Sequence, residues 1–384
     1  MRNICVVVGS RANYSSIKSV MTAINCHPAL HLQVVLIASA LVERYGRVER
    51  LVLTDGFDVD ARVAMLVEGE TPTTMAKSTG LGLVELPSVF DRLQPDVVVV
   101  VGDRFEMMAV TLAAAYMNIP IAHTMGGEVS GTIDESIRHA ITKFAHIHFP
   151  ASKDAAQRIM SMGEREESVH VVGCPRIDLV SEVLSQPLSP DALHEINHTG
   201  VGDEISIHEP FLLVSQHPVT TEYGRGREQI LATMTAVRDT QIPAIVLWPN
   251  PDAGAEHVSS EIRRWRERGL GIGMRFLKSV STETYIHLMN RTACVVGNSS
   301  SGIREGAYTG TPCVNVGTRQ SRRERARNVV DVHHEAEHIT RAIAGQVEHG
   351  RYASDSIYGD GHAGRRIANI LSSATFQLQK SITY

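Results

Sequence analysis

The chain has 384 residues, of which 43% are hydrophobic and 21% charged, with a formal net charge of −5. This length and composition exclude a disordered chain and predict two domains with sizeable cores. The slightly acidic balance, without a long Lys/Arg run, argues against nucleic acid or an anionic membrane as partner. No stretch approaches the ~20 apolar residues of a membrane span. The chain enters an apolar run at residue 4 without secretory-signal features, so we expect a cytoplasmic protein.

Short apolar runs alternate with helical patterns, which is typical of parallel sheets covered on both faces. The first half predicts strands at 4–8, 33–38, 97–101, 119–122 and 169–172, with helices near 15–25, 72–92, 105–117, 135–145 and 152–162. The second half predicts strands at 211–215, 243–248, 272–276, 293–297 and 312–316, with helices near 226–239, 256–268, 282–290, 301–309 and 335–347. A last helix, near 362–379, has no strand after it and must dock on an existing domain.

This pattern predicts an α/β fold of two Rossmann-like, doubly wound domains with a cleft between them. We place the N-terminal domain at 1–178 and the C-terminal domain at 179–358. Residues 359–384 would form a helical segment that returns to the body. The Pro- and Gly-containing segment 185–209 is expected to be loops around a short helix. Ligands of such folds bind beyond the carboxyl ends of the strands, so the residues there are the candidate site.

Polar residues follow two strands of the first half. After the first strand, residues 9–15 (GSRANYS) combine a glycine turn with a helix start that could bind an anion through Arg11, although a capped turn with a solvated arginine explains it too. The segment lacks the G-x-G-x-x-G and P-loop patterns, which disfavours dinucleotide and Walker-type phosphate binding. Asp103 and Arg104 directly follow the strand at 97–101 and should face the site.

The segment after residue 125 is rich in glycine and carboxylates. Asp134 and Arg138 are four residues apart and would share a helix face. A capping box between Thr132 and Glu135 is the alternative, with Asp134 complementing the helix dipole. Gly126 and its neighbouring glycines would bring backbone close to a bound sugar.

The second half offers features of a diphosphate site. Residues 298–302 (NSSSG) lead from a buried strand into a helix, and their hydroxyl and N–H groups suit a diphosphate, although an ordinary Asn/Ser cap is the alternative. Glu305, one turn later, could accept hydrogen bonds from ribose. Proline stiffens the strand exits that carry His217 and Asn250. Arg319 adds a cation after the last predicted strand.

Two other kinds of site are disfavoured. His146-x-His148 and His333-His334 lack a third ligand at a recognisable spacing, so we expect no metal. The G-x-S-x-G elbow of serine hydrolases is absent. We expect no cofactor, a small-molecule substrate, and a homo-oligomer, either a dimer or a tetramer.

From about residue 4 to 379 the chain resembles the hydrolysing UDP-N-acetylglucosamine (UDP-GlcNAc) 2-epimerases of bacterial sialic-acid pathways and of the animal bifunctional enzyme. The resemblance rests on GDRF at 102, GGEVSGTIDESIRHAITK at 126, QHPVTT at 216, NSS at 298, GTRQ at 317 and IYGDG at 357. It implies the two-domain fold of the GT-B class and a reaction without metal or redox cofactor. In that reaction UDP is eliminated across C1–C2 to give a 2-acetamidoglucal, and water and a proton then add to give N-acetylmannosamine.

The resemblance also implies roles for individual residues. Asp103 and Asp134 fall on the catalytic carboxylates, with Arg138 alongside, and we count Glu128 and His217 among the candidate catalytic residues. The positions that hold UDP in the family are Arg11, Ser15, Arg104, His217, Asn250, Ser299, Ser300, Glu305 and Arg319, to which the NSS motif adds Asn298.

Three residues depart from the family pattern. Asn13 replaces the aspartate of R-A-D-Y, Val101 replaces a histidine before G-D-R-F, and Met125 replaces the first glutamate of H-x-E-G-G-E. Met125 removes an acid/base group, so three alternatives stay open: a related nucleotide-sugar hydrolase or epimerase with altered chemistry, a GT-B glycosyltransferase, and a UDP-sugar-binding paralogue with impaired catalysis.

Overall fold

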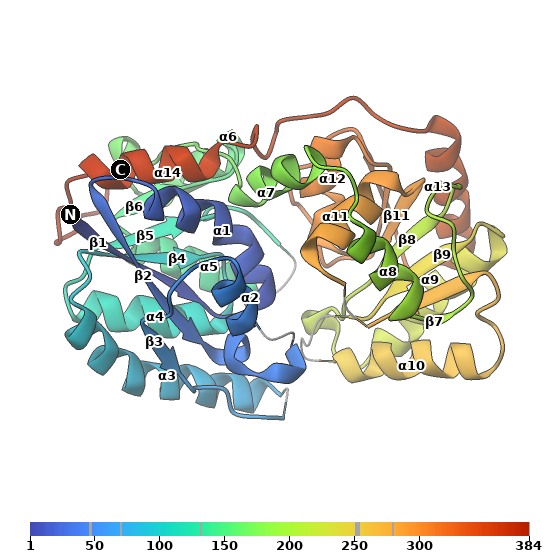
Figure 1. The fold of residues 1–384 in the computed structure, drawn as a ribbon, viewed down its shortest axis with the longest axis horizontal. Coiled ribbons are helices and arrows are strands. Elements are labelled where there is room, and N and C mark those ends of the chain that lie inside the picture. The colour runs from blue at the N-terminus through green and yellow to red at the C-terminus, as the bar shows by residue number, and fades with distance from the viewer. Residues whose placement is uncertain (46–47, 70, 131–132, 250–253, 279, 384) are drawn as a thin grey trace. The chain divides into compact units, whose positions relative to one another are not determined.

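The chain, seen as a computed structural model in Figure 1, is described over residues 1–384 except 46–47, 70, 131–132, 250–253, 279 and 384. It divides into two compact units. Unit 1 comprises Met1–Glu128, Ile133–Leu179 and Tyr358–Tyr384, and unit 2 comprises Val129–Thr132 and Val180–Ile357. Unit 1 therefore contains the first and the last segments of the chain.

Unit 1 is built on a six-stranded parallel sheet with the order β3-β2-β1-β4-β5-β6. This is the Rossmann order, in which the chain reverses its direction of travel across the sheet between β1 and β4. The strands are β1 (Arg2–Val8), β2 (Leu30–Ile37), β3 (Ala61–Val63), β4 (Val97–Val101), β5 (Ile121–Thr124) and β6 (Ile147–Phe149).

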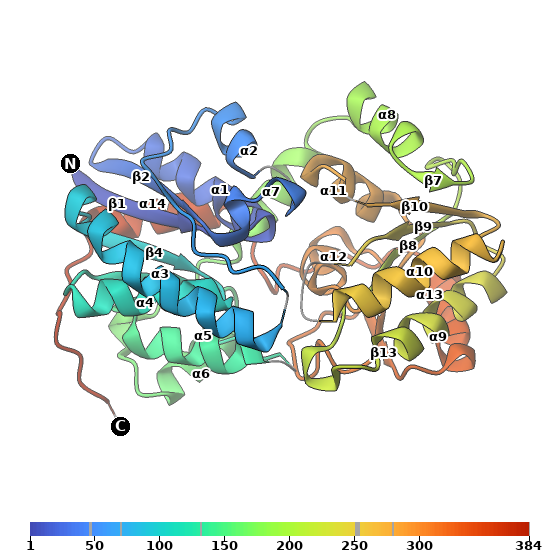
Figure 2. The ribbon, with the colours of Figure 1, turned by 90° about the horizontal axis from the view of Figure 1, so that it is seen from below.

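Helices cover both faces of this sheet, because successive strand residues point to opposite sides. Ile4, Val6 and Val8 pack toward α1 and α14, whereas Cys5 and Val7 pack toward α3, α4 and α5. Figure 2 shows α3 and α4 side by side on their face. The helices of unit 1 are α1 (Arg11–Asn25), α2 (Val48–Thr54), α3 (Pro72–Leu93), α4 (Phe105–Tyr116), α5 (Ile133–Phe144), α6 (Lys153–Ser161) and α14 (Ala363–Ser373), and α7 (Pro175–Leu184) begins in unit 1 and ends in unit 2.

Unit 2 repeats the same topology. Its sheet has the order β13-β12-β11-β8-β9-β10-β7, and all neighbouring strands are parallel except the edge strand β7 beside β10. The reversal now falls between β8 and β11. The strands are β7 (Val201–Gly202), β8 (Leu212–Ser215), β9 (Ala244–Leu247), β10 (Met274–Leu277), β11 (Cys294–Gly297), β12 (Cys313–Val316) and β13 (Val329–Val332).

Two layers of helices cover the second sheet. One core cluster joins it to α9, α10 and α13, and another joins it to α8 and α11. The helices are α8 (Pro190–His198), α9 (Gly226–Asp239), α10 (Ala255–Glu267), α11 (Thr282–Arg291), α12 (Arg304–Thr309) and α13 (Ala336–His349). The prediction of an α/β fold with two Rossmann-like, doubly wound sheets is confirmed.

Several boundaries differ from the predictions. The strand predicted at 169–172 is wrong, because only Val169 bridges to His148 and the sheet ends at the short strand β6. The last helix ends at Ser373 rather than 379, and the segment 374–383 after it lies against unit 1 through its own hydrogen bonds. The edge strands β3, β7 and β13 were not predicted, since none of them is a continuous run of buried apolar residues.

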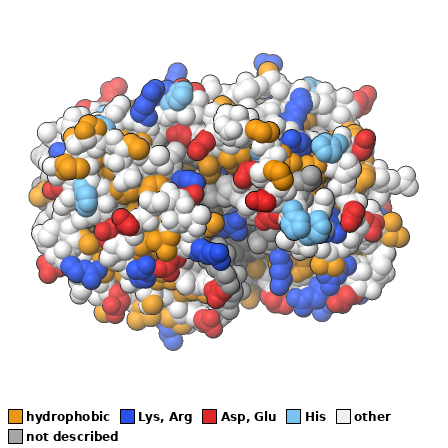
Figure 3. Space-filling model, in the orientation of Figure 1, with side chains coloured by type: hydrophobic (Ala, Val, Ile, Leu, Met, Phe, Trp, Pro, Cys, Tyr) orange, Lys and Arg blue, Asp and Glu red, His pale blue; other side chains and the backbone are white. Residues whose placement is uncertain are grey.

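The distribution of charged side chains on the surface agrees with the small net charge of the chain. On the face drawn in Figure 3, basic and acidic side chains are interspersed. Among the described residues, no helix combines the length and the apolar character that a membrane crossing requires.

Candidate active site

In unit 1 the exits of β1 and β4 are joined by one buried amide. The side-chain NH₂ of Asn13 donates to the carbonyl of Val101 (3.1 Å), and the side-chain oxygen accepts from the N–H of Gly9 (3.1 Å). These two strands flank the reversal of the sheet, where ligands of doubly wound folds bind. Asn13 therefore fixes the spacing of the two loops at that point.

Arg138 of α5 joins the exits of β4 and β5. Its side chain is 1% exposed; Nη2 forms an ion pair with Asp103 Oδ2, and Nη1 donates to the backbone carbonyl of Glu128 (2.6 Å). The structure thus brings together three predicted site residues that are far apart in sequence. Asp134, half-buried, lies in the first turn of the same helix. Thr132, the proposed cap, lies outside the described residues.

His123 of β5 connects the turn after β4 with helix α5. One ring nitrogen, Nε2, is 2.8 Å from the carbonyl of Gly102, and the other, Nδ1, is 3.2 Å from the hydroxyl of Thr142 on α5. Burial lowers the pKa of His123 to about 3, so the ring is neutral near pH 7. A carbonyl only accepts, so Nε2 carries the proton and Nδ1 accepts from Thr142. His123 thereby holds the turn that presents Asp103.

Arg104 is held by a buried carboxylate. Its Nε donates to Glu106 Oε1 (2.9 Å), and the Glu106 side chain is only 1% exposed. Gly9 leaves room for Glu106, since a Cβ at that glycine would come within 2.7 Å of Glu106 Cγ. Glu106 therefore orients Arg104 at the same sheet reversal that Asn13 spans.

In unit 2 the reversal is spanned by another asparagine. The side chain of Asn298, which is fully buried, accepts from the backbone N–H of His217 (2.7 Å) and donates to the carbonyl of His217 (2.9 Å). Its own backbone carbonyl accepts from Arg319 Nη1 (3.2 Å) and Gln320 Nε2 (3.0 Å). Asn298 thus connects the exits of β8 and β11 through its side chain and the exit of β12 through its backbone carbonyl.

The serine segment after β11 differs from the prediction. The prediction of a continuous helix over 301–309 is wrong, because Ser300–Gly302 forms a 3₁₀ turn and α12 begins only at Arg304. Ser299 and Ser301 bond each other through their hydroxyls (2.8 Å), and Ser301 also bonds the hydroxyl of Tyr285. Ser300, half-buried, is therefore the serine whose hydroxyl these internal bonds do not use.

The remaining predicted residues lie at the same strand ends. Arg11 is half-buried in the first turn of α1, and Ser15, one turn later, is 6% exposed. Glu305 is buried in the first turn of α12. Asn250 lies outside the described residues.

The family model described as UDP-N-acetylglucosamine 2-epimerase matches residues 22–372. The chain belongs to this family. It is accordingly an enzyme of the nucleotide-sugar 2-epimerase class.

Individual relatives agree with this assignment. The chain is 31% identical over 379 residues to a hydrolysing UDP-N,N′-diacetylbacillosamine 2-epimerase of Legionella pneumophila, covering 99% of this chain and 98% of that one. It is 28% identical to a UDP-N-acetylglucosamine 2-epimerase of Neisseria meningitidis, covering 94% and 92%. A solved structure of the Methanocaldococcus jannaschii UDP-GlcNAc 2-epimerase with UDP-GlcNAc and UDP superposes with a TM-score of 0.82 at 17% identity, covering 97% and 100%, which supports the fold.

Met125, the main departure from the family pattern in this epimerase, sits in a strained turn after β5. Its φ is 60°, in the left-handed region that few side chains favour. Its N–H donates to the carbonyl of Phe149 (3.0 Å), and its sulfur is 3.8 Å from the thiol of Cys174. The thioether carries no proton, so Met125 can shape this part of the site but cannot act as an acid or base.

The other two departures are linked to each other. Asn13 donates to the carbonyl of Val101, and an ionised aspartate at position 13 would place two acceptors against each other. An amide is thus the side chain that satisfies both partners here. Val101 itself is 1% exposed and packs in the core, so it contributes a backbone carbonyl rather than a side chain to the site.

Sequence reasoning placed His123 and Glu106 in the segments at the strand ends but gave neither a role in the site. His123 is the residue before Thr124 at the end of β5, and Glu106 directly follows the GDRF motif. A polar residue within an apolar strand was the signal that could have found His123, and a lone carboxylate at the start of the otherwise apolar helix α4 could have found Glu106. The motif IYGDG makes contacts within unit 1: the carbonyl of Tyr358 accepts from the N–H of Cys174 (2.7 Å), and Asp360 pairs with Arg366 of α14 (2.6 Å).

Proposed function

We propose that the chain is a hydrolysing UDP-GlcNAc 2-epimerase that converts UDP-GlcNAc and water to N-acetylmannosamine and UDP. The observation that carries the proposal is the buried Arg138, which draws Asp103 and the Glu128 backbone together beside the helix that bears Asp134. Carboxylates at strand exits suit a reaction in which a weakly acidic C–H proton must be removed and returned.

The proposed first step is an elimination. A carboxylate, Asp103 or Asp134, takes the proton from C2 while the bond between C1 and the UDP oxygen breaks, which leaves a 2-acetamidoglucal and UDP. In the second step water adds its hydroxyl to C1, and C2 receives a proton from the opposite face. Atoms balance with one water consumed and no redox change. Arg104, oriented by Glu106, is proposed to stabilise the charge on the departing diphosphate.

Unit 2 is proposed to bind the nucleotide. Ser300 would donate to a phosphate oxygen, Glu305 would accept from ribose hydroxyls, and Arg319 would offset the diphosphate charge. His217, whose backbone is held at both polar groups by Asn298, would contact the same nucleotide. Two structurally similar epimerases were solved with UDP-GlcNAc, one of them also with UDP, which supports a UDP-sugar as the ligand.

An NMR time course in D₂O tests the proposal, with UDP-GlcNAc as substrate. We expect wild-type protein to release UDP and N-acetylmannosamine that carries deuterium at C2, because the returned proton comes from solvent. Met125→Glu should change the rate by no more than a few-fold if Asp103, Asp134 and Glu128 suffice for proton transfer.

Other outcomes would redirect the assignment. A rise of ~10²–10⁴-fold in Met125→Glu, the contribution of one acid/base group, would mean that the wild-type site lacks a required carboxylate. Free N-acetylglucosamine without deuterium at C2 would exclude epimerisation. Turnover only with an added sugar acceptor would indicate a glycosyltransferase, and UDP binding without turnover would indicate a binding paralogue.

A second substrate is favoured by one observation: two relatives, from Legionella pneumophila and Campylobacter jejuni, are named as 2-epimerases of nucleotide-linked N,N′-diacetylbacillosamine. We therefore propose UDP-N,N′-diacetylbacillosamine as the alternative substrate of the same site. The same NMR experiment with both UDP-sugars decides between them through the ratio of kcat/KM values.

Ser300→Ala together with Glu305→Ala is expected to weaken UDP binding, because each substitution removes hydrogen bonds worth ~1–3 kcal/mol when one partner is charged. Calorimetry with UDP measures the change. Ser301→Ala is the matched control, since that hydroxyl is already bonded to Ser299 and Tyr285. Equal UDP affinity of a folded double variant and the wild type would locate the nucleotide elsewhere.

A further inference from the structure

Helix α5 organises the candidate site of unit 1 through two buried side chains. Arg138 binds Asp103 and the carbonyl of Glu128, and Thr142 binds His123, which in turn holds the turn at Gly102. A shift of α5 along its axis would therefore move the exits of both β4 and β5. What fixes the end of α5 accordingly matters for the site.

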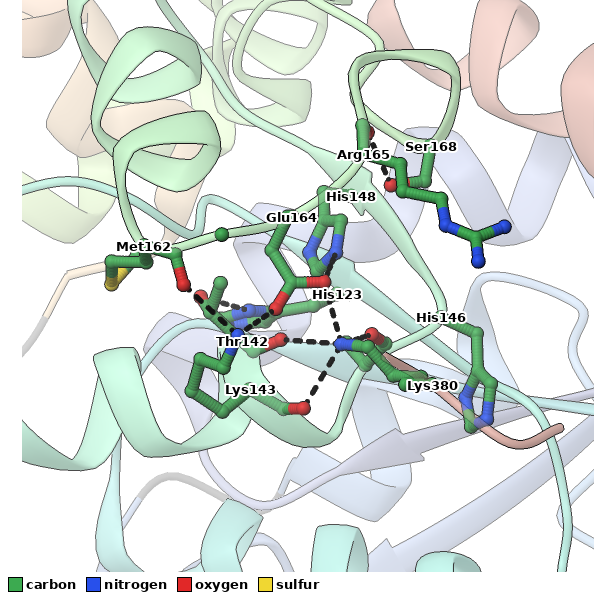
Figure 4. A network of polar contacts seen from close by, with 12 residues as sticks. His123, Thr142, Lys143, His146, His148, Met162, Glu164, Arg165, Ser168 and Lys380 are labelled. Atoms are coloured by element: carbon green, nitrogen blue, oxygen red, sulfur yellow. Dashed lines mark hydrogen bonds and ion pairs between the residues drawn. The ribbon is translucent and has the colours of Figure 1, made fainter. Parts of the chain in front are cut away.

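The carboxyl end of α5 is capped by a lysine from the far end of the chain. Lys380 Nζ donates to the carbonyls of Thr142 (3.4 Å) and Lys143 (2.9 Å), and also to that of Ala145 just beyond the helix (Figure 4). The last carbonyls of a helix have no partner within it, and a cation there also complements the helix dipole. One ammonium group thus satisfies carbonyls that the helix leaves open.

Lys380 is itself held by a buried carboxylate. Glu164, whose side chain is 3% exposed, binds Lys380 (2.6 Å), Lys143 (2.6 Å) and His148 (3.1 Å). Burial alone would raise the pKa of Glu164, but hydrogen bonds from these three side chains lower it to about 2, so the group is ionised near pH 7. His148 lies on β6, so the carboxylate ties the cap of α5 to the sheet.

Further contacts hold the rest of the segment 374–383. The carbonyl of Leu378 accepts from His146 (3.2 Å), Gln377 accepts from Arg165 (2.8 Å), and the N–H of Thr383 donates to the carbonyl of Gly163 (3.1 Å). These contacts stand on both sides of Lys380 along the chain. The segment therefore lies in a defined path, with Lys380 directed inward.

We propose that Lys380 is a positioning residue of the active site, and that the segment after α14 is a strap that holds α5, and through it Arg138 and Thr142, in register with the exits of β4 and β5. The part of this inference that concerns catalysis rests on the proposed function. The part that concerns the position of α5 does not.

The variant Lys380→Met tests the proposal, because it keeps the aliphatic stem and removes the ammonium group. Amide hydrogen exchange, followed by mass spectrometry without substrate, is expected to become about tenfold faster in peptides that cover 133–145, with little change in α1. We expect kcat to fall about tenfold, while KM and the Kd for UDP stay within about twofold, because the proposed contacts of Ser300, Glu305 and Arg319 lie in unit 2 and Arg104 is held by Glu106 of α4 rather than by α5. Lys380→Arg retains a cationic donor, so its α5 exchange rate and its kcat should both lie close to the wild-type values.

Lys18→Met is the matched control. Lys18 is also a partly buried lysine of unit 1 in an ion pair, with Asp55 (2.7 Å), but it lies on α1. The Lys18→Met variant should leave the hydrogen exchange of α5 and kcat unchanged. Unchanged exchange of α5 in Lys380→Met would overturn the proposal, as would faster exchange throughout unit 1 with wild-type kcat. Faster α5 exchange in a protein whose wild type shows no turnover would support the strap and reject the proposed function instead.

Discussion

Asp103→Asn is expected to lower turnover of UDP-GlcNAc by about 100-fold or more while leaving the affinity for UDP nearly intact. Asparagine cannot take up a proton as a carboxylate does, and general acid–base groups typically contribute ~10²–10⁴-fold. The change also removes the negative partner of Arg138, a guanidinium that is 1% exposed. Loss of one charged hydrogen bond should destabilise the fold by about 1.5–3 kcal/mol.

The two effects of Asp103→Asn can be separated. Turnover is measured by NMR without urea, at a temperature well below the thermal unfolding midpoint of the variant. Stability is measured by urea unfolding. Glu49→Gln is a control within unit 1, because Glu49 and Arg62 form an exposed ion pair (2.6 Å) that contributes about 0–1 kcal/mol. Wild-type turnover of folded Asp103→Asn would limit Asp103 to its structural pairing with Arg138 and exclude it from proton transfer.

Gly127→Ala is expected to destabilise unit 1 strongly. Gly127 has a φ of 76°, and a Cβ there would come within 2.2 Å of the backbone oxygen of Ala155 and 2.8 Å of Ile159 Cγ1 in α6. The left-handed backbone costs ~1–2 kcal/mol for an alanine and overpacking typically adds ~1–3 kcal/mol. The sum is a large share of the ~5–15 kcal/mol that stabilise an ordinary domain.

Gly56→Ala separates the two causes. Gly56 also has a positive φ, 85°, but no atom lies within 4 Å of its added Cβ, so only the backbone cost applies. Urea unfolding of both variants measures the difference. Equal destabilisation by the two substitutions would mean that α6 does not press on the turn after β5, and that Glu128 is positioned in some other way.

Topology was predictable because it follows from local patterns. The five consecutive valines of β4 and the apolar runs of β1, β8 and β11 can be buried on both faces only in a parallel sheet with helices on each side. Edge strands such as β3 and β13 escaped prediction because exposed residues interrupt their apolar pattern. The end of α14 was missed because the following segment is held by contacts with residues more than 200 positions away, such as Gly163 and Ala145.

The sequence by itself determined the two Rossmann-like halves, the strand exits at which Asp103, His217 and Ser300 stand and the helix start that carries Asp134, because strand periodicity and chain order are local properties. Only the tertiary structure decided which side chains share a partner. Asn13 and Asn298 each span a sheet reversal, Arg138 joins two loops, and Lys380 caps a helix that ends 236 residues before it. Such contacts depend on how the strands are ordered in space, and buried polar groups must find partners there that sequence separation does not reveal.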